Sequence, residues 1–462
     1  MARKRATGEK ISKEAYEERE SALRTQLLAC QGDLMDENYP VLIVLNGLDP
    51  EPINEVLNAF FEWFDPRYVE PHALHERTAK ERKDLFLRRY WQRIPARGRI
   101  AIFAGGWILD AYDELHDGDV SLFQFARNLI HIRKFERQLF EAGAHVIKLW
   151  IGEEPRLDPD EPSVQMLQQT DWAAAEWAIV DTQHSRNRKL ACGELVAESL
   201  RHRLDGERTT LEATPLRDRA DIESPPRLAD VDLSVSLDRE EYRAKRKKLQ
   251  KKLHKLSDAC CKKGIPAVFA FEGWDAGGKG GAIRRITQAV DARNWKVVSV
   301  AAPTDGEKAY PYLWRFWRHL PQPGTITMFD RTWYGRVLVE RVEGFASDHD
   351  WQRAYDEIRD LEEQLVETGA ALCKFWLHID RDEQLARFKA REKIPYKQYK
   401  ITEEDYRNRD KWDAYVEACD EMFARTSTEA APWTLVAAND KYNARIIVLK
   451  TVCDALERAL DR

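Results

Sequence analysis

The stretch that decides the fold is Phe271–Ile283, with the sequence FEGWDAGGKGGAI. A short apolar run at 268–271 leads into it, and Ile283, Ile286 and Val290 then recur at helical spacing. The predicted order is therefore strand, glycine-rich loop and helix. In that setting consecutive backbone N–H groups of the loop can face a phosphate, and the positive end of the helix dipole adds to the attraction.

The spacing Gly273-x4-Gly278-Lys279 matches the phosphate-binding P-loop up to its last position. Gly280 stands where that motif has Ser or Thr, so the hydroxyl that would bind magnesium is missing. Asp275 offers a carboxylate inside the loop as a substitute ligand for a hard cation. The alternative is a glycine-rich turn that only packs a helix against a sheet, and the lysine argues against it. We expect the loop glycines to bind phosphate: Gly273, Gly277, Gly278 and Gly280.

Composition indicates a soluble globular protein with two or three domains. The chain has 462 residues, of which 43% are hydrophobic and 33% charged, and its net charge is −6. It shows no run typical of a membrane span or signal peptide, and its seven cysteines form no CxxC pair. We expect a cytoplasmic protein with no nucleic-acid or membrane partner, in which a local basic cluster binds any anionic substrate.

The chain contains an internal repeat with an offset of 226 residues. The offset takes Gly47 to Gly273 and Asp49 to Asp275, and it still takes Lys148-x-Trp150 to Lys374-x-Trp376. So many ungapped matches indicate a tandem duplication of one α/β unit. A stretch rich in Pro, Asp and Arg separates the copies without periodicity. We expect a first domain at 1–214, a linker at 215–235 and a second domain at 236–462.

Strands and helices are predicted to alternate within each copy. In the second copy we expect strands at 266–271, 296–301, 325–329 and 371–377, and helices at 279–292, about 308–318 and 350–368. This alternation is typical of a parallel, doubly wound sheet covered by helices on both faces. The fold class expected is therefore α/β, with two tandem domains like those of P-loop kinases.

An acid follows the strand predicted at 325–329. In P-loop folds an aspartate at such a strand end faces the nucleotide crevice and holds magnesium. Asp330 could therefore share one or two magnesium ions with Asp275, where they would bridge donor and acceptor phosphates. The alternative is that Asp330 only caps the next helix.

Three arginines follow this acid in DRTWYGRVLVERVEGF, and their five-residue spacing places at least part of the run in a loop. Guanidinium groups present a planar fork of donors that suits phosphate. We favour phosphate contacts for Arg331 and Arg336. Arg341 could equally form an ordinary salt bridge with Glu340 or Glu343.

A basic segment at about 387–412 is predicted to form a lid on the second domain. Pro395 interrupts its helical pattern, which gives a helix–loop–helix that could close over a site. Six basic residues accumulate in it before the acids at 403–405: Arg387, Lys389, Arg391, Lys393, Lys397 and Lys400. A solvated charged face is the alternative. The first copy lacks this segment, and it lacks the phosphate-binding residues as well, which favours the lid.

The first copy retains the residues that pack the fold, but it has lost the predicted phosphate-binding and catalytic residues. Pro50 and Pro52, which have no amide proton, stand opposite Ala276 and Gly278. The positions of Lys279, Asp330, Arg331 and Arg336 hold Ile53, Ala104, Gly105 and Asp110. We interpret the first copy as catalytically inactive.

Taken together, the glycine loop GWDAGGKGG, the segment at 321–345 and the lid at 388–405 resemble the signatures of the polyphosphate kinase 2 family. The resemblance implies phosphoryl transfer between inorganic polyphosphate and a purine nucleotide, with magnesium, or manganese in its place. It also implies a catalytic set made of Asp275, Lys279, Asp330 and Arg331. In the lid, the resemblance implies phosphate binding by Arg391, Lys397 and Lys400. Two fused copies with only the second intact resemble the class that phosphorylates AMP to ADP.

Three other functions remain open at this point. One is polyphosphate-dependent phosphorylation of ADP to ATP, and another is an ATP-dependent P-loop nucleotide kinase. The third is a scaffold that binds polyphosphate or nucleotide without catalysis, which the complete second site argues against. A tandem chain could mimic a dimer internally and still form a larger homo-oligomer.

Overall fold

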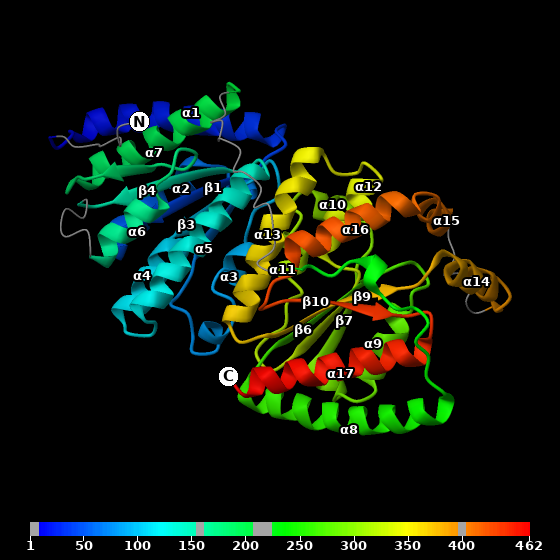
Figure 1. Cartoon of the computed structure of the whole chain (residues 1–462). Helices are drawn as coiled ribbons and strands as arrows, with labels where there is room; N and C mark the ends of the chain where they lie inside the picture. The colour runs from blue at the N-terminus through cyan, green and yellow to red at the C-terminus, as the bar shows by residue number, and fades with distance from the viewer. Residues whose placement is uncertain (1–8, 154–160, 207–223, 396–402) are drawn as a thin grey trace. The chain divides into compact units, whose positions relative to one another are not determined.

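The computed structural model describes residues 9–153, 161–206, 224–395 and 403–462 (Figure 1). The chain divides into two compact units. Unit 1 comprises Met1–Arg82, Phe86–Ala213 and Pro303–Arg318, and unit 2 comprises Lys83–Leu85, Thr214–Ala302 and His319–Arg462. Within the described ranges, no helix has the length and apolar character needed to cross a lipid bilayer.

Unit 1 contains a five-stranded parallel sheet in the order β2-β3-β1-β4-β5. Its strands are β1 (Val41–Asn46), β2 (Val69–Ala73), β3 (Ile100–Ala104), β4 (His145–Ile151) and β5 (Trp177–Val180). Its main helices are α1 (Lys13–Met35), α2 (Pro50–Trp63), α3 (Arg88–Trp91), α4 (Gly106–His116), α5 (Leu122–Glu141), α6 (Pro162–Thr170) and α7 (Ser185–Leu204).

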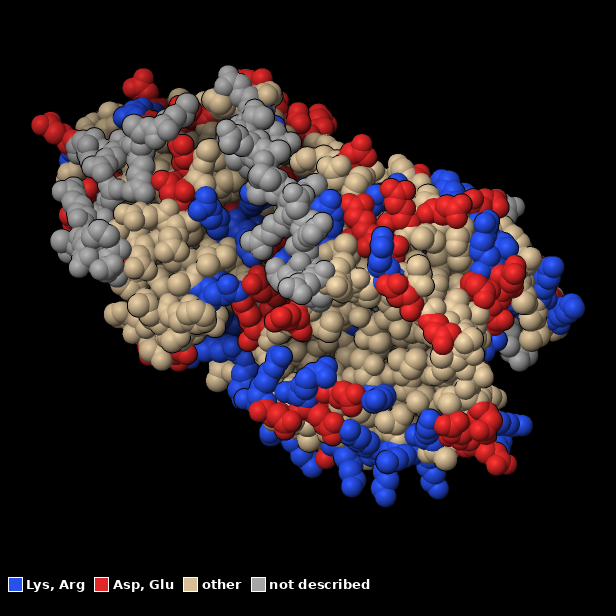
Figure 2. All heavy atoms as spheres, in the orientation of Figure 1, with Lys and Arg blue, Asp and Glu red and all other residues tan. Residues whose placement is uncertain are grey.

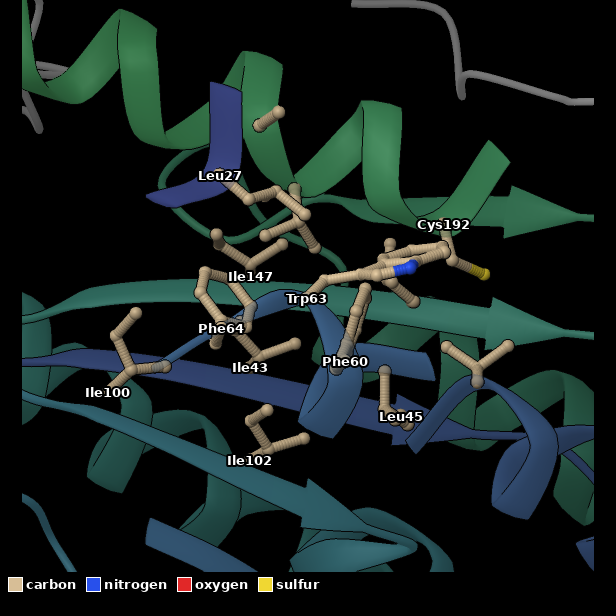
Figure 3. Packing of buried hydrophobic residues seen from close by; sticks show 14 of the residues in the cluster. Leu27, Ile43, Leu45, Phe60, Trp63, Phe64, Ile100, Ile102, Ile147 and Cys192 are labelled. Atoms are coloured by element: carbon tan, nitrogen blue, oxygen red, sulfur yellow. The ribbon is translucent and has the colours of Figure 1, made fainter. Parts of the chain in front are cut away.

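The core of unit 1 lies between this sheet and helices α1, α2 and α7 (Figure 3). Leu27 of α1, Phe60 and Trp63 of α2 and Cys192 of α7 meet Ile43 of the central strand there. Every residue of β1 is buried, because helices cover both faces of the sheet. This explains why the strand reads as a continuous apolar run rather than an alternating one.

Unit 2 repeats the architecture with the strand order β10-β9-β6-β8-β7, again all parallel. Its strands are β6 (Ala267–Gly273), β7 (Trp295–Ser299), β8 (Ile326–Asp330), β9 (Ala371–His378) and β10 (Trp433–Ala437). Its helices include α8 (Arg239–Lys263), α9 (Lys279–Thr287), α12 (Val339–Val342), α13 (Asp348–Glu367), α14 (Arg381–Glu392), α15 (Glu403–Asp410), α16 (Trp412–Thr426) and α17 (Lys441–Leu460). The predicted doubly wound parallel fold is confirmed.

Helices α8 and α17 lie side by side along one face of the second sheet (Figure 1). Lys252 of α8 donates to Glu457 of α17 over 2.7 Å. Lys and Arg side chains gather along α8 on the face shown in Figure 2. Two lysines of this helix, Lys245 and Lys262, pair with acids one turn away. This is the solvated face of an amphipathic helix.

The two sheets correspond strand by strand. β2 and β7, β3 and β8, and α5 and α13 are all related by the offset of 226 residues. After β4 and β9 the offset grows to 256, since Thr170 matches Thr426 and Trp177 matches Trp433. The second copy therefore carries thirty additional residues, and α14 and α15 lie at this insertion.

Two helix predictions were wrong in detail. A single helix was expected at about 308–318, but two short helices form, α10 (Asp305–Lys308) and α11 (Trp314–Trp317). Pro311 between them cannot donate a helical hydrogen bond. The helix expected at 279–292 ends at Thr287, and the Asp291 side chain then caps a separate 3-10 turn.

Candidate active site

The loop between β6 and α9 has a backbone that glycine alone accommodates at its start. Gly273 has φ +140°, and a Cβ there would lie 2.5 Å from the carbonyl oxygen of Leu377 on β9. Gly278 has φ +112° and precedes the first residue of α9, Lys279. The loop therefore runs closely against the sheet and presents its backbone at the helix N-terminus, as a phosphate-binding loop does.

Two basic side chains hold the loop in shape. The Lys279 ammonium donates to the carbonyl oxygen of Gly273 over 2.6 Å. The buried guanidinium of Arg387, on α14, donates to the carbonyl oxygens of Ala276 over 2.9 Å and Gly277 over 3.0 Å. These bonds come from Nη1, and Nη2 donates to the carbonyl oxygens of Ala438 and Asn439. Arg387 therefore braces the loop against the end of β10.

The loop aspartate lies in a basic, hydrogen-bonded environment. Asp275 accepts from Arg331 and from Asn408 of α15, each over 3.0 Å. Burial alone would raise the pKa of the Asp275 carboxyl, but the charges of Lys279 and Arg331 and these hydrogen bonds hold it below its ordinary value. Asp275 is therefore ionised at neutral pH.

The aspartate at the end of β8 lies next to the first turn of α9. A Cβ built on Gly280 would stand 3.9 Å from Oδ2 of Asp330, so a larger residue at 280 would face that carboxylate. The structure thus brings the strand end and the loop together. The alternative role of Asp330 as a helix cap does not apply, since Thr332 caps the 3-10 turn Trp333–Val337.

A buried carboxylate on β6 fixes the backbone after Asp330. Oε1 of Glu272 accepts from both the N–H and the hydroxyl of Thr332, each over 2.7 Å. Burial raises the pKa of Glu272, against the opposing effects of Lys279, Thr332 and Arg331. Arg331, which lies between Asp330 and Thr332 in the sequence, adopts φ +64°.

The other two predicted arginines have carboxylate partners. Arg336 pairs with Glu340 at 2.8 Å. Arg341 does not use Glu340 or Glu343: it pairs with Glu421 of α16 at 2.6 Å and lies over the ring of Trp351 at 4.1 Å. Its contacts are therefore with α13 and α16 and not with the loop.

The end of the segment predicted to form a lid packs on the loop through an aromatic stack. The Trp274 and Trp412 rings lie parallel, with centroids 3.6 Å apart, and Trp274 Nε1 donates to Nδ1 of His378 over 2.9 Å. Burial lowers the pKa of His378 to about 4, which keeps it neutral and able to accept. Lys411 anchors the segment to Glu343 at 3.0 Å. The candidate ligands Lys397 and Lys400 lie outside the described residues.

A cavity of about 340 Å³ opens beside the loop. Its wall includes the backbone of Gly277, Gly278 and Gly281 and four basic side chains: Arg387, Arg391, Lys441 and Arg445. No acid is found among the described residues that line it. A cavity with this lining favours an extended anion.

The first copy forms no such loop. Helix α2 begins at Pro50, the position equivalent to Ala276, so a helical turn replaces the glycine segment. Asp49, the equivalent of Asp275, caps this helix by accepting from the N–H of Glu51 over 3.0 Å. Asp110, which replaces Arg336, pairs with Arg89 at 3.4 Å.

Comparison with known proteins agrees with this geometry. The sequence profile described as polyphosphate kinase 2 matches residues 10–156 and 236–462. The chain belongs to the polyphosphate kinase 2 family. A polyphosphate:AMP phosphotransferase of Pseudomonas aeruginosa is 40% identical over 486 residues, which cover 98% of each chain. One of Acinetobacter johnsonii is 37% identical and covers 96% of this chain and 97% of its own.

A solved polyphosphate kinase 2 structure from Pseudomonas aeruginosa superimposes on 99% of this chain with a TM-score of 0.87 and 41% identity. Other polyphosphate kinase 2 relatives match less of the chain. A GDP-polyphosphate phosphotransferase of Mycolicibacterium smegmatis is 40% identical over 214 residues, 46% of this chain and 76% of its own.

Several residues of the site were missed from the sequence. Glu272, Asn408, Lys441 and Arg445 reach the loop, its cavity or its partners only through the tertiary fold. For Glu272 the sequence offered one signal. Its equivalent in the first copy is Asn46, so this position differs between the copies as the other site residues do. Asn408 had no comparable signal, because the first copy has no equivalent segment.

Proposed function

We propose that the protein transfers a phosphoryl group from inorganic polyphosphate to AMP, giving ADP, at the loop of unit 2. The observation that carries this proposal is the match over nearly the whole chain to relatives named polyphosphate:AMP phosphotransferase. The structure supports it, because unit 2 has the phosphate loop and unit 1 has a helix in its place.

In the proposed reaction, a phosphate oxygen of AMP attacks the terminal phosphorus of polyphosphate. The bond from that phosphorus to the bridging oxygen breaks, and the chain leaves one unit shorter. Loop amides and Lys279 would hold the transferred group, while Arg331 stabilises the charge that develops on it. No protein nucleophile is required, since positioning and charge neutralisation supply the catalysis.

Magnesium fits the donor set at the site. Asp330 and Asp275 provide carboxylate oxygens, and Mg²⁺ commonly binds to one or two carboxylates together with substrate phosphates and water. When bound, the ion would neutralise phosphate charge between donor and acceptor. Because Asp275 already accepts from Arg331 and Asn408, an ion bound to its carboxylate would compete with these two hydrogen bonds.

The basic cavity beside the loop suits the donor. Polyphosphate is a regular polyanion, and the phosphates behind the terminal one need a path without carboxylates. Arg391, Lys441 and Arg445 offer such a path from the loop to the start of α17.

The test is an acceptor and donor screen of the purified full chain. AMP, GMP, ADP and GDP are each supplied with polyphosphate of defined length and Mg²⁺, and the products are separated by ion exchange. ADP formation from AMP is expected to be fastest. Preference for ADP or GDP would instead indicate the activities for which its shorter relatives are named. Transfer from ATP in the absence of polyphosphate would contradict the proposed donor.

A further inference from the structure

Arg331 has a backbone conformation that arginine rarely adopts. Its φ of +64° lies in the left-handed region, and Ala276 in the loop is the one other non-glycine residue with positive φ in the described ranges. The guanidinium that this conformation directs to the loop lies 3.0 Å from Asp275. The strained backbone is thus located at the chemistry, where such strain commonly has a purpose.

Hydrogen bonds hold the peptide units on both sides of this strained residue. The N–H of Arg331 donates to the carbonyl oxygen of Phe271 over 3.0 Å. The following residue, Thr332, donates twice to Glu272 Oε1, through its N–H and its hydroxyl. Glu272 is 6% exposed and Thr332 is 2% exposed, so water competes little with these bonds. We call this pair the Glu272–Thr332 clamp.

The first copy makes a different turn at this point and lacks the Glu272–Thr332 pair. Gly105 and Gly106 occupy the positions of Arg331 and Thr332, with φ +90° and +71°, whereas Thr332 is extended with φ −144°. The N–H of Gly105 still donates to Leu45, the equivalent of Phe271, over 2.8 Å. Asn46 replaces Glu272. Glycine adopts these angles without strain, so the turn needs no carboxylate to hold it.

We propose that Glu272 and Thr332 are positioning residues for phosphoryl transfer. By fixing residue 332, the clamp keeps Arg331 in its strained conformation, with the guanidinium beside Asp275 and the reacting phosphates. Neither residue needs to touch a substrate, since the effect passes through Arg331. This inference rests on the proposed function for its kinetic test and on the structure alone for the clamp itself.

Removing either half of the clamp is expected to lower turnover more than substrate affinity. Thr332→Val keeps the shape and the N–H but loses the hydroxyl, and Glu272→Met removes the acceptor. For each we expect kcat to fall at least about tenfold, with KM for AMP and polyphosphate changing less than about threefold. Thr332→Ser restores the hydroxyl and should remain within about twofold of the native kcat. A native kcat in the Val and Met variants would overturn the proposal.

A double-mutant cycle separates positioning from a general loss of stability. In an Arg331→Gly background the guanidinium and the strain are both gone, so adding Glu272→Met should cost less than about a further twofold in kcat. A full tenfold loss in that background would mean that Glu272 acts independently of Arg331. Melting temperatures of all four proteins show whether the native fold is retained.

Hydrogen exchange tests the clamp independently of any acceptor. Glu272→Met leaves the Thr332 hydroxyl free to cap the turn Trp333–Val337, yet it should raise amide exchange in that turn, while exchange in strand β9 stays as in the native protein. Unchanged exchange in that turn would overturn the clamp even if the variant is less active. If the native protein makes no ADP from AMP and polyphosphate, the proposed function is wrong. The exchange experiment would still test the clamp, because it does not depend on activity.

Discussion

At the scale of single residues, the loop lysine and the strand-end aspartate are the positions where a small change should cost most activity. Lys279→Ala removes the cation at the loop, and Asp330→Asn removes a carboxylate charge beside Gly280. We expect each to lower the rate of ADP formation from AMP and polyphosphate at least ~100-fold, as the loss of one main electrostatic contact does. Rates close to native in either variant would refute the site.

The first copy offers a matched control for this prediction. Asp49→Asn changes the residue equivalent to Asp275, and asparagine can still cap α2. We therefore expect both the melting temperature and the rate of ADP formation to stay close to native. A large loss of activity with an unchanged melting temperature would show that unit 1 takes part in the reaction.

The site residues that could be predicted from the sequence are those that belong to a local sequence motif or directly follow a predicted strand. Asp275 and Lys279 belong to a contiguous motif, and Asp330 follows a recognisable strand. The structure places all three at the same edge of the sheet. Asn408 is different: it meets Asp275 across 133 positions of chain, and such a contact depends on tertiary packing that no local spacing encodes.

At the scale of elements, Arg387 shows how helix α14 supports the loop. Its guanidinium donates to four carbonyl oxygens and pairs with Glu383 at 2.5 Å. Lysine keeps the charge but cannot span this set, because its three donors radiate from one nitrogen. Arg387→Lys is therefore expected to destabilise unit 2 by roughly 2–3 kcal/mol in chemical denaturation and to lower activity with it. Loss of activity at native stability would instead indicate direct phosphate binding.

Helix α4 in unit 1 gives a pH-dependent prediction. Burial, together with Asp110 and Asp117, raises the pKa of Asp113 to about 6. The folded state thus binds this proton more tightly than the unfolded chain, and stability falls as pH rises from about 4 to 6. Asp113→Asn removes this loss, so we expect a gain of about 1 kcal/mol at pH 7.5, allowing for solvent screening.

The measurement for Asp113→Asn is denaturant unfolding of the full chain at two pH values. The gain over native protein should shrink at pH 4.5, where the folded native carboxyl is already protonated. A gain that is equal at both pH values would contradict the assigned titration. Asn and Asp have similar helix propensities, so the backbone contributes little to the difference.

Element boundaries were less predictable than element types. The apolar runs at β6 and β9 predicted buried strands because helices cover both faces of a parallel sheet. The helix expected at about 308–318 is divided in two because Pro311 has no N–H to donate to a helical hydrogen bond. In this segment the capping box of Thr304 and Glu307 starts one short helix, and the next begins only after the proline.

At the scale of the whole molecule, the duplication separates residues that maintain the fold from residues that perform chemistry. Each unit buries a lysine–glutamate pair, Lys148–Glu136 at 3.0 Å and Lys374–Glu362 at 2.8 Å. A tryptophan donates to each glutamate, from Trp107 in unit 1 and Trp333 in unit 2. Within the described parts of the chain, the loop and the Glu272–Thr332 clamp are found in unit 2 alone. We therefore infer that the buried network serves the fold, and that the loop and clamp serve the proposed reaction.

This division predicts different outcomes for two matched substitutions. Glu136→Gln and Glu362→Gln each leave a lysine buried without its counter-charge, which costs roughly 3–5 kcal/mol of local stability. Hydrogen exchange should rise in β4 for the first variant and in β9 for the second. At assay temperatures below the melting temperature of each variant, only Glu362→Gln should slow ADP formation, because β9 packs against Gly273 of the loop. Equal loss of activity in both variants would mean that the first copy contributes directly to catalysis.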